Sequence, residues 1–375
     1  MAGGGRRPGR PLHLAAERAF YDASVAHLHS LVATLQSEMS SRVPVTDVSV
    51  PWRRLTGSYY TEHAAGRDYP RLMREILRFE TGEDPDPVPK GGTTDANRAV
   101  RTVLLDQNDL TDGSGYLDVG VLLVSPDERF LAYAVDTAGD EVFRLRFRDL
   151  DSGKDLAEEV PRTYYGGAWS GDGSAYLYTV HDEAYRPCQL WRHALGTDPG
   201  ADTLLLEESD ERFELRLRQA RSGGAIVVWA ESNTTTECWL LDPHDLDRPP
   251  RSAGGRRAGV KYRVEHRRLR DGTEDLLVVT DDDATELRLM TAPVPRAADQ
   301  DHTSWMEARP EQPAERLERA DAFASGVVLS LRRGGEHLVR LLRHDDLGGP
   351  GLDVESAHAG GETRIAFTPW YDSPP

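Results

Sequence analysis

The 375-residue sequence contains little cysteine and almost no lysine. Its two cysteines, Cys188 and Cys238, form neither a disulfide framework nor a metal site by themselves, so we expect a reducing, cytoplasmic setting. Lysine occurs only at Lys90, Lys154 and Lys261, so arginine provides almost all of the positive charge.

Long apolar runs are also missing. The first residues, MAGGGRRPGRP, are basic but are followed by no apolar segment, so we expect no secretory signal. No stretch approaches the roughly 18 apolar residues of a membrane span. We therefore predict no membrane partner.

Positive charge is in deficit, since 45 Lys and Arg residues face 63 Asp and Glu residues, a net charge of −18. A nucleic-acid-binding protein is typically basic, with a stripe of positive residues, and this sequence has none. We therefore predict no nucleic-acid partner. The acidity favours either solubility or the attraction of cationic substrates and partners.

What the chain does contain is a repeat. Its clearest copy, residues 125–150, reads SPDERFLAYAVDTAGDEVFRLRFRDL: a polar turn, an alternating apolar strand, a second turn and a second alternating strand. Similar turns begin at Ser170 and Ser222, a spacing of roughly 45 to 50 residues that is typical of four-stranded β-propeller blades. We predict an all-β protein, a β-propeller of about six blades over residues 43–375.

A helix is predicted before the strands, over residues 14–42, following a disordered tail at 1–13. Its apolar side chains recur with helical spacing and form one face: Leu28, Leu31, Val32, Leu35 and Met39. The polar face is not strongly basic, so we expect the apolar face to pack against the rest of the molecule.

Several ordered motifs resemble the N-terminal part of oligopeptidase B, within the prolyl oligopeptidase family of serine peptidases. They are Thr46-Asp47-Val48-Ser49-Val50-Pro51, Tyr59-Tyr60-Thr61, Gly66-Arg67-Asp68-Tyr69-Pro70, Val135-Asp136-Thr137-Ala138-Gly139-Asp140-Glu141, Thr163-Tyr164-Tyr165-Gly166 and Asp182-Glu183-Ala184-Tyr185-Arg186-Pro187. The resemblance implies a propeller of the seven-bladed type that caps an α/β-hydrolase domain and admits short peptides. It also implies cleavage after Arg or Lys, and therefore short basic peptides and a hydrolase domain as partners.

The chain departs from that family in its chemistry. The nucleophile motif G-x-S-x-G does not occur, and Gly113-Ser114-Gly115 and Gly171-Asp172-Gly173-Ser174 are predicted to be ordinary turns. We expect no catalytic residue, no cofactor and no peptide hydrolysis by the chain alone. It is then a truncated propeller that serves as gate and size filter.

A freestanding propeller used as a protein-binding scaffold is the alternative, although none of the seven tryptophans is followed by Asp as in WD repeats. A lactonase-like enzyme with a metal in its central channel would need inward-facing ligands that we cannot assemble. A ring that stops one strand into its last blade should leave open edges, so we also predict self-association through them.

Two sets of residues are candidates for interdomain contact or substrate gating. Asp140 and Glu141 lie at a turn and are either solvated acids or, as the resemblance implies for Glu141, a partner for a cation of the catalytic domain. Asp182, Glu183, Tyr185 and Arg186 either line the inner tunnel or form surface salt bridges. We expect no metal site, because the histidines do not cluster and Asp281-Asp282-Asp283 lacks calcium-loop spacing.

Overall fold

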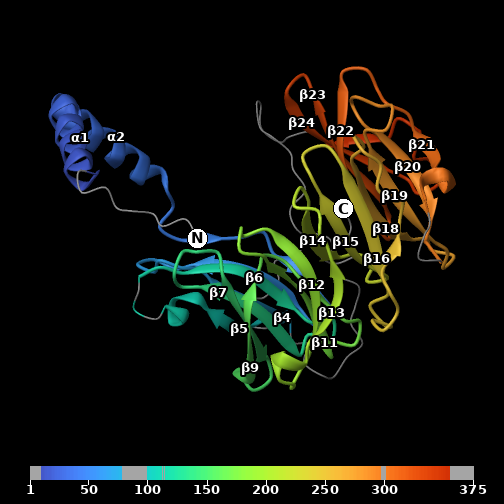
Figure 1. The fold of residues 1–375 in the computed structure, drawn as a ribbon, viewed down its shortest axis with the longest axis horizontal. Helices are drawn as coiled ribbons and strands as arrows, with labels where there is room; N and C mark the ends of the chain where they lie inside the picture. Colours follow the sequence, from blue (N-terminus) through green and yellow to red (C-terminus); the bar gives the residue numbers. More distant parts are fainter. Residues whose placement is uncertain (1–9, 78–98, 112, 114, 297–300, 355–375) are drawn as a thin grey trace.

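The computed structural model describes residues 10–77, 99–111, 113, 115–296 and 301–354. These residues form a helical arm followed by strands in six antiparallel units, which we call blades 1 to 6 (Figure 1). All six blades contribute to the wall of one central cavity. The predicted all-β propeller is therefore confirmed. No helix among the residues described is long and apolar enough to cross a membrane.

The strands of the first three blades occur in chain order. Blade 1 contains β1 (Asp47–Val48), β2 (Trp52–Arg53), β3 (Ser58–His63), β4 (Arg71–Leu77) and β5 (Ala99–Asp106). Blade 2 contains β6 (Asp118–Val124), β7 (Phe130–Asp136), β8 (Phe143–Asp149) and β9 (Lys154–Thr163). Blade 3 contains β10 (Ala168–Trp169), β11 (Ala175–His181), β12 (Pro187–Ala194) and β13 (Thr203–Glu207).

The remaining blades repeat the pattern of four strands. Blade 4 contains β14 (Glu214–Gln219), β15 (Ile226–Glu231), β16 (Thr236–Leu241) and β17 (Arg251–Ser252). Blade 5 contains β18 (Tyr262–Arg268), β19 (Glu274–Thr280), β20 (Arg288–Pro293) and β21 (Met306–Arg309). Blade 6 contains β22 (Glu315–Phe323), β23 (Gly326–Arg333), β24 (Glu336–Leu342) and β25 (Leu352–Val354).

The repeated serine turn joins the first two strands of blades 2 and 3, as the sequence spacing predicts. In blade 2 the Ser125 hydroxyl donates to Asp127 at 2.5 Å and accepts the N–H of Phe130 at 2.9 Å. In blade 3 Ser170 makes the same pair of contacts, to Asp172 at 2.7 Å and from Ala175 at 2.9 Å. The hydroxyl thus satisfies a backbone donor where the chain reverses.

Burial follows from the stacking of the blades. Strand β7 lies between two other strands and between two blades, so six of its seven residues are buried. In β8 the buried residues Phe143, Leu145 and Phe147 alternate with arginines that are not buried. Separate apolar cores fill the space between each pair of consecutive blades.

Blades 2 and 3 share one continuous sheet, which the repeat did not predict. Strand β10 has only two residues and covers only Tyr176 and Leu177 of β11. The other end of β11 is therefore free to pair with the end of β9, through Val180 and Thr163. The N–H of Tyr164 donates to the carbonyl of Thr179 at 2.9 Å and extends this contact.

The helical arm differs from its prediction. The structure has α1 (Arg10–Val25), a 3-10 turn (Ala26–Leu28) and α2 (His29–Arg42) in place of one helix. The helical structure begins at Arg10, inside the segment 1–13 predicted to be disordered. The arm projects away from the blades (Figure 1), and Leu31, Leu35 and Met39 are 52%, 48% and 68% exposed. The prediction that this face packs against the rest of the molecule is therefore wrong for the residues described.

Short or charged strands were also missed. The apolar pattern predicts that the sixth blade begins near Phe323, but β22 begins at Glu315, because the segment ERLERADAF alternates charged and apolar residues too irregularly to be recognised. Strands β17 and β21 fall in segments with few apolar residues. The sequence also predicts a loop over 79–97, from its Gly, Pro and Asp content, and a last strand over 363–367; both segments lie outside the described residues.

Candidate functional site

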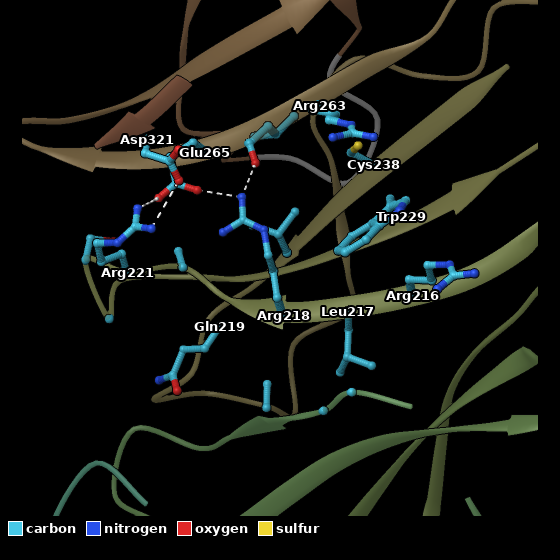
Figure 2. Close-up of a pocket in the computed structure, with 18 of the residues that line it drawn as sticks. Arg216, Leu217, Arg218, Gln219, Arg221, Trp229, Cys238, Arg263, Glu265 and Asp321 are labelled. Atoms are coloured by element: carbon cyan, nitrogen blue, oxygen red, sulfur yellow. Dashed lines mark hydrogen bonds and ion pairs between the residues drawn. The ribbon is translucent and has the colours of Figure 1, made fainter. Parts of the chain in front are cut away.

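The six blades surround a central cavity of about 1190 Å³, part of which Figure 2 shows. Its wall is formed largely by the innermost strands β6, β10, β14, β18 and β22 and by the turns beside them. Small-molecule sites typically measure roughly 300–1000 Å³. The cavity therefore has room for a peptide of several residues.

Strand β14 brings arginines to this wall because its charged and apolar residues alternate. Leu215 and Leu217 belong to the core between blades 3 and 4. Arg216 and Arg218, which lie between and after them, line the cavity. Their side chains are 48% and 41% exposed, so solvent reaches both inside the ring.

Arg218 begins a charge network that joins blades 4, 5 and 6 (Figure 2). It donates to Glu265 of β18 at 2.5 Å and to the carbonyl of Val264 at 2.9 Å. Arg221, in the turn after β14, lies 3.5 Å from the other oxygen of Glu265 and donates to Asp321 of β22 at 3.1 Å. Blades 4, 5 and 6 are separate sheets, and this network connects them where they meet.

The two signs of charge differ in their access to solvent. Glu265 and Asp321 are buried, with side chains 4% and 7% exposed, whereas those of Arg218 and Arg319 are 41% and 48% exposed. Burial opposes the charge of Arg218, but the adjacent Glu265 raises the pKa of Arg218 above its ordinary value. The charges that this part of the wall presents to a ligand are therefore positive.

A second ion pair holds blades 1 and 2 together at the wall of the cavity. The guanidinium of Arg54 lies 3.7 Å from the buried carboxylate of Glu128 and donates to the carbonyl of Ser125 at 2.8 Å. The hydroxyl of Tyr59 donates to Glu128 at 3.0 Å. Burial and the nearby carboxylate raise the pKa of Tyr59, so its phenol stays protonated and remains a donor.

The candidate pair Asp140 and Glu141 lies in the turn between β7 and β8, and both residues are exposed. The turn is shaped by Asp136, which accepts N–H groups from Ala138, Gly139 and Glu141 at 2.7, 2.9 and 2.9 Å. Burial opposes the charge of Asp136, yet these donors lower the pKa of Asp136 below its ordinary value. Glu141 is thereby held at φ +58°, with its side chain turned to solvent.

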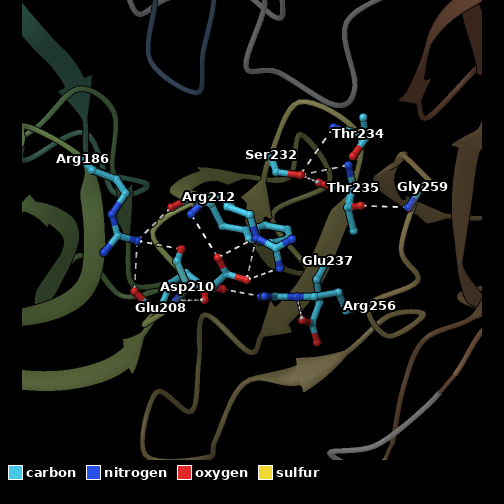
Figure 3. Close-up of polar contacts among 11 residues, drawn as sticks. Arg186, Glu208, Asp210, Arg212, Ser232, Thr234, Thr235, Glu237, Arg256 and Gly259 are labelled. Atoms are coloured by element: carbon cyan, nitrogen blue, oxygen red, sulfur yellow. Dashed lines mark hydrogen bonds and ion pairs between the residues drawn. The ribbon is translucent and has the colours of Figure 1, made fainter.

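The second candidate set lies in the turn between β11 and β12 and does not line the cavity. Arg186 donates to Asp182 at 2.9 Å and to the carbonyls of Glu208, Asp210 and Phe213 at 3.2, 3.1 and 3.0 Å (Figure 3). These contacts fix the segment that leads into blade 4. None of the four residues is among those that line the cavity, and their role in gating stays a prediction.

The other two members of that set are directed to solvent. Glu183 is exposed, and Tyr185 is 52% exposed at φ +62°. The ring of Tyr185 stacks on His181, with centroids 5.1 Å apart and planes at 14°. The four residues therefore share one turn, but only Asp182 and Arg186 are joined by an ion pair.

Arg256 also connects blades 3 and 4, through contacts near Phe213. It was not among the predicted residues. It forms ion pairs with Glu208 and, at 2.8 Å, with Glu237 (Figure 3). Its guanidinium also lies 4.0 Å from the centroid of the Phe213 ring. Charged residues thus connect blades 3 and 4 as well as blades 4 to 6.

Ser222 and His266 form a serine–histidine pair at the cavity, with Ser222 Oγ 2.7 Å from His266 Nδ1. A nucleophilic serine contacts the histidine nitrogen opposite the one that a carboxylate orients, commonly Nε2. Here the contact is to Nδ1, and the Glu274 carboxylate lies 3.8 Å from Nε2, too far for a hydrogen bond that would orient the ring. Ser222 Oγ also accepts the N–H of Gly224 at 3.2 Å. In this blade Ala220 takes the turn position of Ser125 and Ser170, so the turn begins two residues before the predicted start at Ser222. Ser222 takes the position of Asp127 and Asp172, whose side chains likewise accept the N–H two residues later, so we interpret it as a turn-forming residue.

The charged residues of the cavity were not found from the sequence. Arg218 and Glu265 are 47 residues apart, and Arg221 and Asp321 are 100 residues apart. The only local signal is the alternation of leucine and arginine in β14. That pattern shows two arginines on one side of a strand, but it does not show what faces them.

The comparisons with known proteins agree with this architecture. A family model described as the prolyl oligopeptidase N-terminal β-propeller domain matches residues 6–360. Protease 2 from Moraxella lacunata is 30% identical over 284 residues, which cover 75% of this chain and 39% of that protein. Dipeptidyl aminopeptidase BI from Pseudoxanthomonas mexicana is 30% identical over 341 residues, which cover 89% of this chain and 45% of that protein.

The structure also resembles a solved peptidase. Oligopeptidase B from Leishmania major superposes with a TM-score of 0.75 at 23% identity, over 92% of this chain and 46% of that one. At this identity the likeness concerns the fold. The chain spans less than half the length of these three proteins.

Proposed function

Because the chain belongs to the prolyl oligopeptidase N-terminal β-propeller family, we propose that it is the substrate-filtering part of a serine endopeptidase. In this proposal it works with an α/β-hydrolase domain and does not hydrolyse peptides alone. The hydrolase domain cleaves short peptides after Arg or Lys, as the resemblance to oligopeptidase B implies. The propeller is the gate and the size filter.

The observation that supports a covering domain most directly is the exposed apolar surface of the arm. Of the 21 large apolar side chains that are exposed among the described residues, 14 lie between Leu12 and Leu55. Phe20, Val32 and Met39 are 73%, 55% and 68% exposed. Soluble proteins rarely leave such a concentration of apolar surface without a partner. A second domain that packs on the arm would remove it from water.

The gate itself is supported by the cavity and by the turn at Glu141. The cavity is open to solvent at Arg216 and Arg218, which is what a route through the ring would require. Glu141 is exposed at the tip of a turn that Asp136 holds rigid. In the proposal Glu141 pairs with a cation of the hydrolase domain and stabilises the closed state.

The test combines the chain with the separately expressed hydrolase half of Protease 2 from Moraxella lacunata. We expect the two halves to form a complex that sedimentation velocity detects. The complex should cleave short arginyl peptides and should not cleave a folded protein. Leu35→Asp places a charge on the apolar face of the arm, 48% exposed, and should weaken the complex at least about tenfold, by roughly 1.4 kcal/mol or more.

The matched control is Gln36→Asp, which introduces the same charge at the next residue, outside the apolar face. It should leave both assembly and peptide cleavage unchanged. Failure of the two halves to associate, or equal loss with both variants, would refute docking through the arm. Cleavage of folded protein as fast as of short peptides would refute the size filter.

A further inference from the structure

The wall of the central cavity carries an excess of positive charge in a protein whose net charge is −18. Its lining contains six arginines and three carboxylates, Glu231, Glu265 and Asp321. A strongly acidic chain would be expected to present acidic residues there as well. The local sign of charge is therefore opposite to that of the whole molecule.

The excess is greater at the surface that a ligand would touch. Glu265 and Asp321 are buried behind the arginines that they pair with, at 4% and 7% exposure. Arg216, Arg218 and Arg319 are 41% to 48% exposed. Glu265 and Asp321 fix the guanidinium groups of Arg218 and Arg319 in place, and these groups face the solvent of the cavity. Arg216 pairs instead with Glu214, whose side chain is 47% exposed.

Arg218 also has donor atoms to spare. The contacts to Glu265 and to the carbonyl of Val264 both involve one terminal nitrogen, Nη2. A guanidinium carries five N–H donors and binds carboxylates through two parallel hydrogen bonds. An Arg218 side chain held by Glu265 is thus oriented before a ligand arrives, which lowers the entropy cost of binding.

Trp229 adds an apolar surface beside these charges. It pairs with Arg216 across β14 and β15, is half-buried, and lines the same cavity as Arg263 (Figure 2). A peptide presents carboxylates and aliphatic groups within a few ångströms of each other. The combination of indole and guanidinium groups fits such a chain better than it fits a small inorganic ion.

We propose that the central cavity binds short peptides through their acidic side chains, with Arg216 and Arg218 as carboxylate-binding residues. The extension of this proposal to substrates rests on the proposed function. It states that a substrate peptide has Asp or Glu at positions distant from the bond that is cleaved. It is compatible with cleavage after Arg or Lys, because the carboxylates that select those residues lie in the hydrolase domain of the family that the chain resembles.

The test measures binding to the chain alone by isothermal titration calorimetry at low ionic strength. The probes are three hexapeptides with blocked ends, alternating Gly with Glu, Gln or Lys. We expect the Glu peptide to bind about tenfold more tightly than the Gln peptide, and the Lys peptide to bind most weakly. Added salt should reduce this difference, because screening weakens accessible charges.

Arg216→Gln and Arg218→Gln should each weaken binding of the Glu peptide about three- to tenfold. Arg216 pairs with Glu214, whose side chain is 47% exposed, so Arg216→Gln leaves no buried charge and should fold even if Arg218→Gln does not. The control is Arg343→Gln, 79% exposed and paired with Asp345 outside the cavity, which should bind as the wild type does.

Four results would each overturn the inference. They are equal binding of the Glu and Gln peptides, tighter binding of the Lys peptide, no binding of any peptide, and an effect of Arg343→Gln as large as that of Arg216→Gln. None of these results bears on docking of the arm, which the Leu35→Asp experiment measures separately. Failure of the wild-type chain to associate with the hydrolase half, together with retained Glu-peptide binding, would refute the proposed function and leave the cavity as an acidic-peptide site.

Discussion

Replacement of Arg186 by methionine should destabilise the protein considerably, although the residue lies in a surface turn. The side chain of Arg186 is 14% exposed, and its Nη1 faces the carbonyls of Glu208, Asp210 and Phe213. One terminal nitrogen has two hydrogens, so the three acceptors share about two full hydrogen bonds. Methionine retains the length of the side chain and removes all of these donors.

The magnitude follows from those two bonds. Hydrogen bonds from a charged donor contribute about 1.5 to 3 kcal/mol each when buried, and the lower value applies at a partly accessible turn. The pair with Asp182, whose side chain is 33% exposed, adds about 0.5 kcal/mol. We therefore expect Arg186→Met to reduce the free energy of unfolding by about 3.5 kcal/mol.

Urea unfolding followed by tryptophan fluorescence measures this loss. The neighbouring Arg212 is the control, because it is 79% exposed, pairs with the Asp210 carboxylate and lies 5.8 Å from the centroid of the Phe213 ring, so Arg212→Met should unfold close to the wild type. A loss below about 1 kcal/mol for Arg186→Met, or equal losses for both variants, would refute the assignment of Arg186 as the anchor between blades 3 and 4.

Four further predictions concern the other charged groups and the edges of the sheets. Glu265→Gln should lower the free energy of unfolding in urea by about 2 kcal/mol, because Arg218 and Arg221 lose a buried partner; a loss under about 0.5 kcal/mol would contradict this. Hydrogen bonds from a neighbouring hydroxyl and N–H lower the pKa of Asp172 to about 2, so its stabilisation is present above the unfolded pKa and is lost as the pH falls to about 2. Asp172→Asn should therefore cost about 1 kcal/mol at pH 7, after allowance for solvent exposure, and nothing near pH 2; a cost that is equal at both pH values would be inconsistent with this. Glu141→Gln should leave stability unchanged within about 0.5 kcal/mol and weaken cleavage in the complex with the hydrolase half, and unchanged kinetics would reject its role at the closed state. Self-association through sheet edges stays a prediction, for which a concentration-independent sedimentation coefficient would be the contrary result.

The blades could be predicted from the sequence because the forces that specify them act locally. A strand such as β7 is recognised by its apolar run, and the turn at Ser125 by its hydroxyl and the aspartate two residues later. The turn at Glu141 was placed correctly for the same reason. Its supporting residue, Asp136, was missed, although an aspartate followed by Gly three residues later is a signal for such a turn.

The candidate site could not be predicted to the same extent, because its contacts join residues from different blades. The alternation in β14 shows that Arg216 and Arg218 share a side, but only the ring places Glu265 opposite them. The exposure of the helical arm could not be read from its pattern either. An apolar face at helical spacing predicts burial, and it does not say whether the chain itself supplies the surface that buries it.

The sheet that continues from blade 2 into blade 3 makes the joints of the ring mechanically unequal. To separate those two blades, the pairing of Val180 with Thr163 and the Tyr164–Thr179 hydrogen bond must be broken. Blades 4, 5 and 6 are separate sheets that meet through apolar side chains and ion pairs. Under a load that widens the ring, blades 2 and 3 would move as one stiff segment. The deformation would concentrate where separate sheets meet through side chains, between blades 1 and 2 and among blades 4 to 6, where the arginines of the cavity lie.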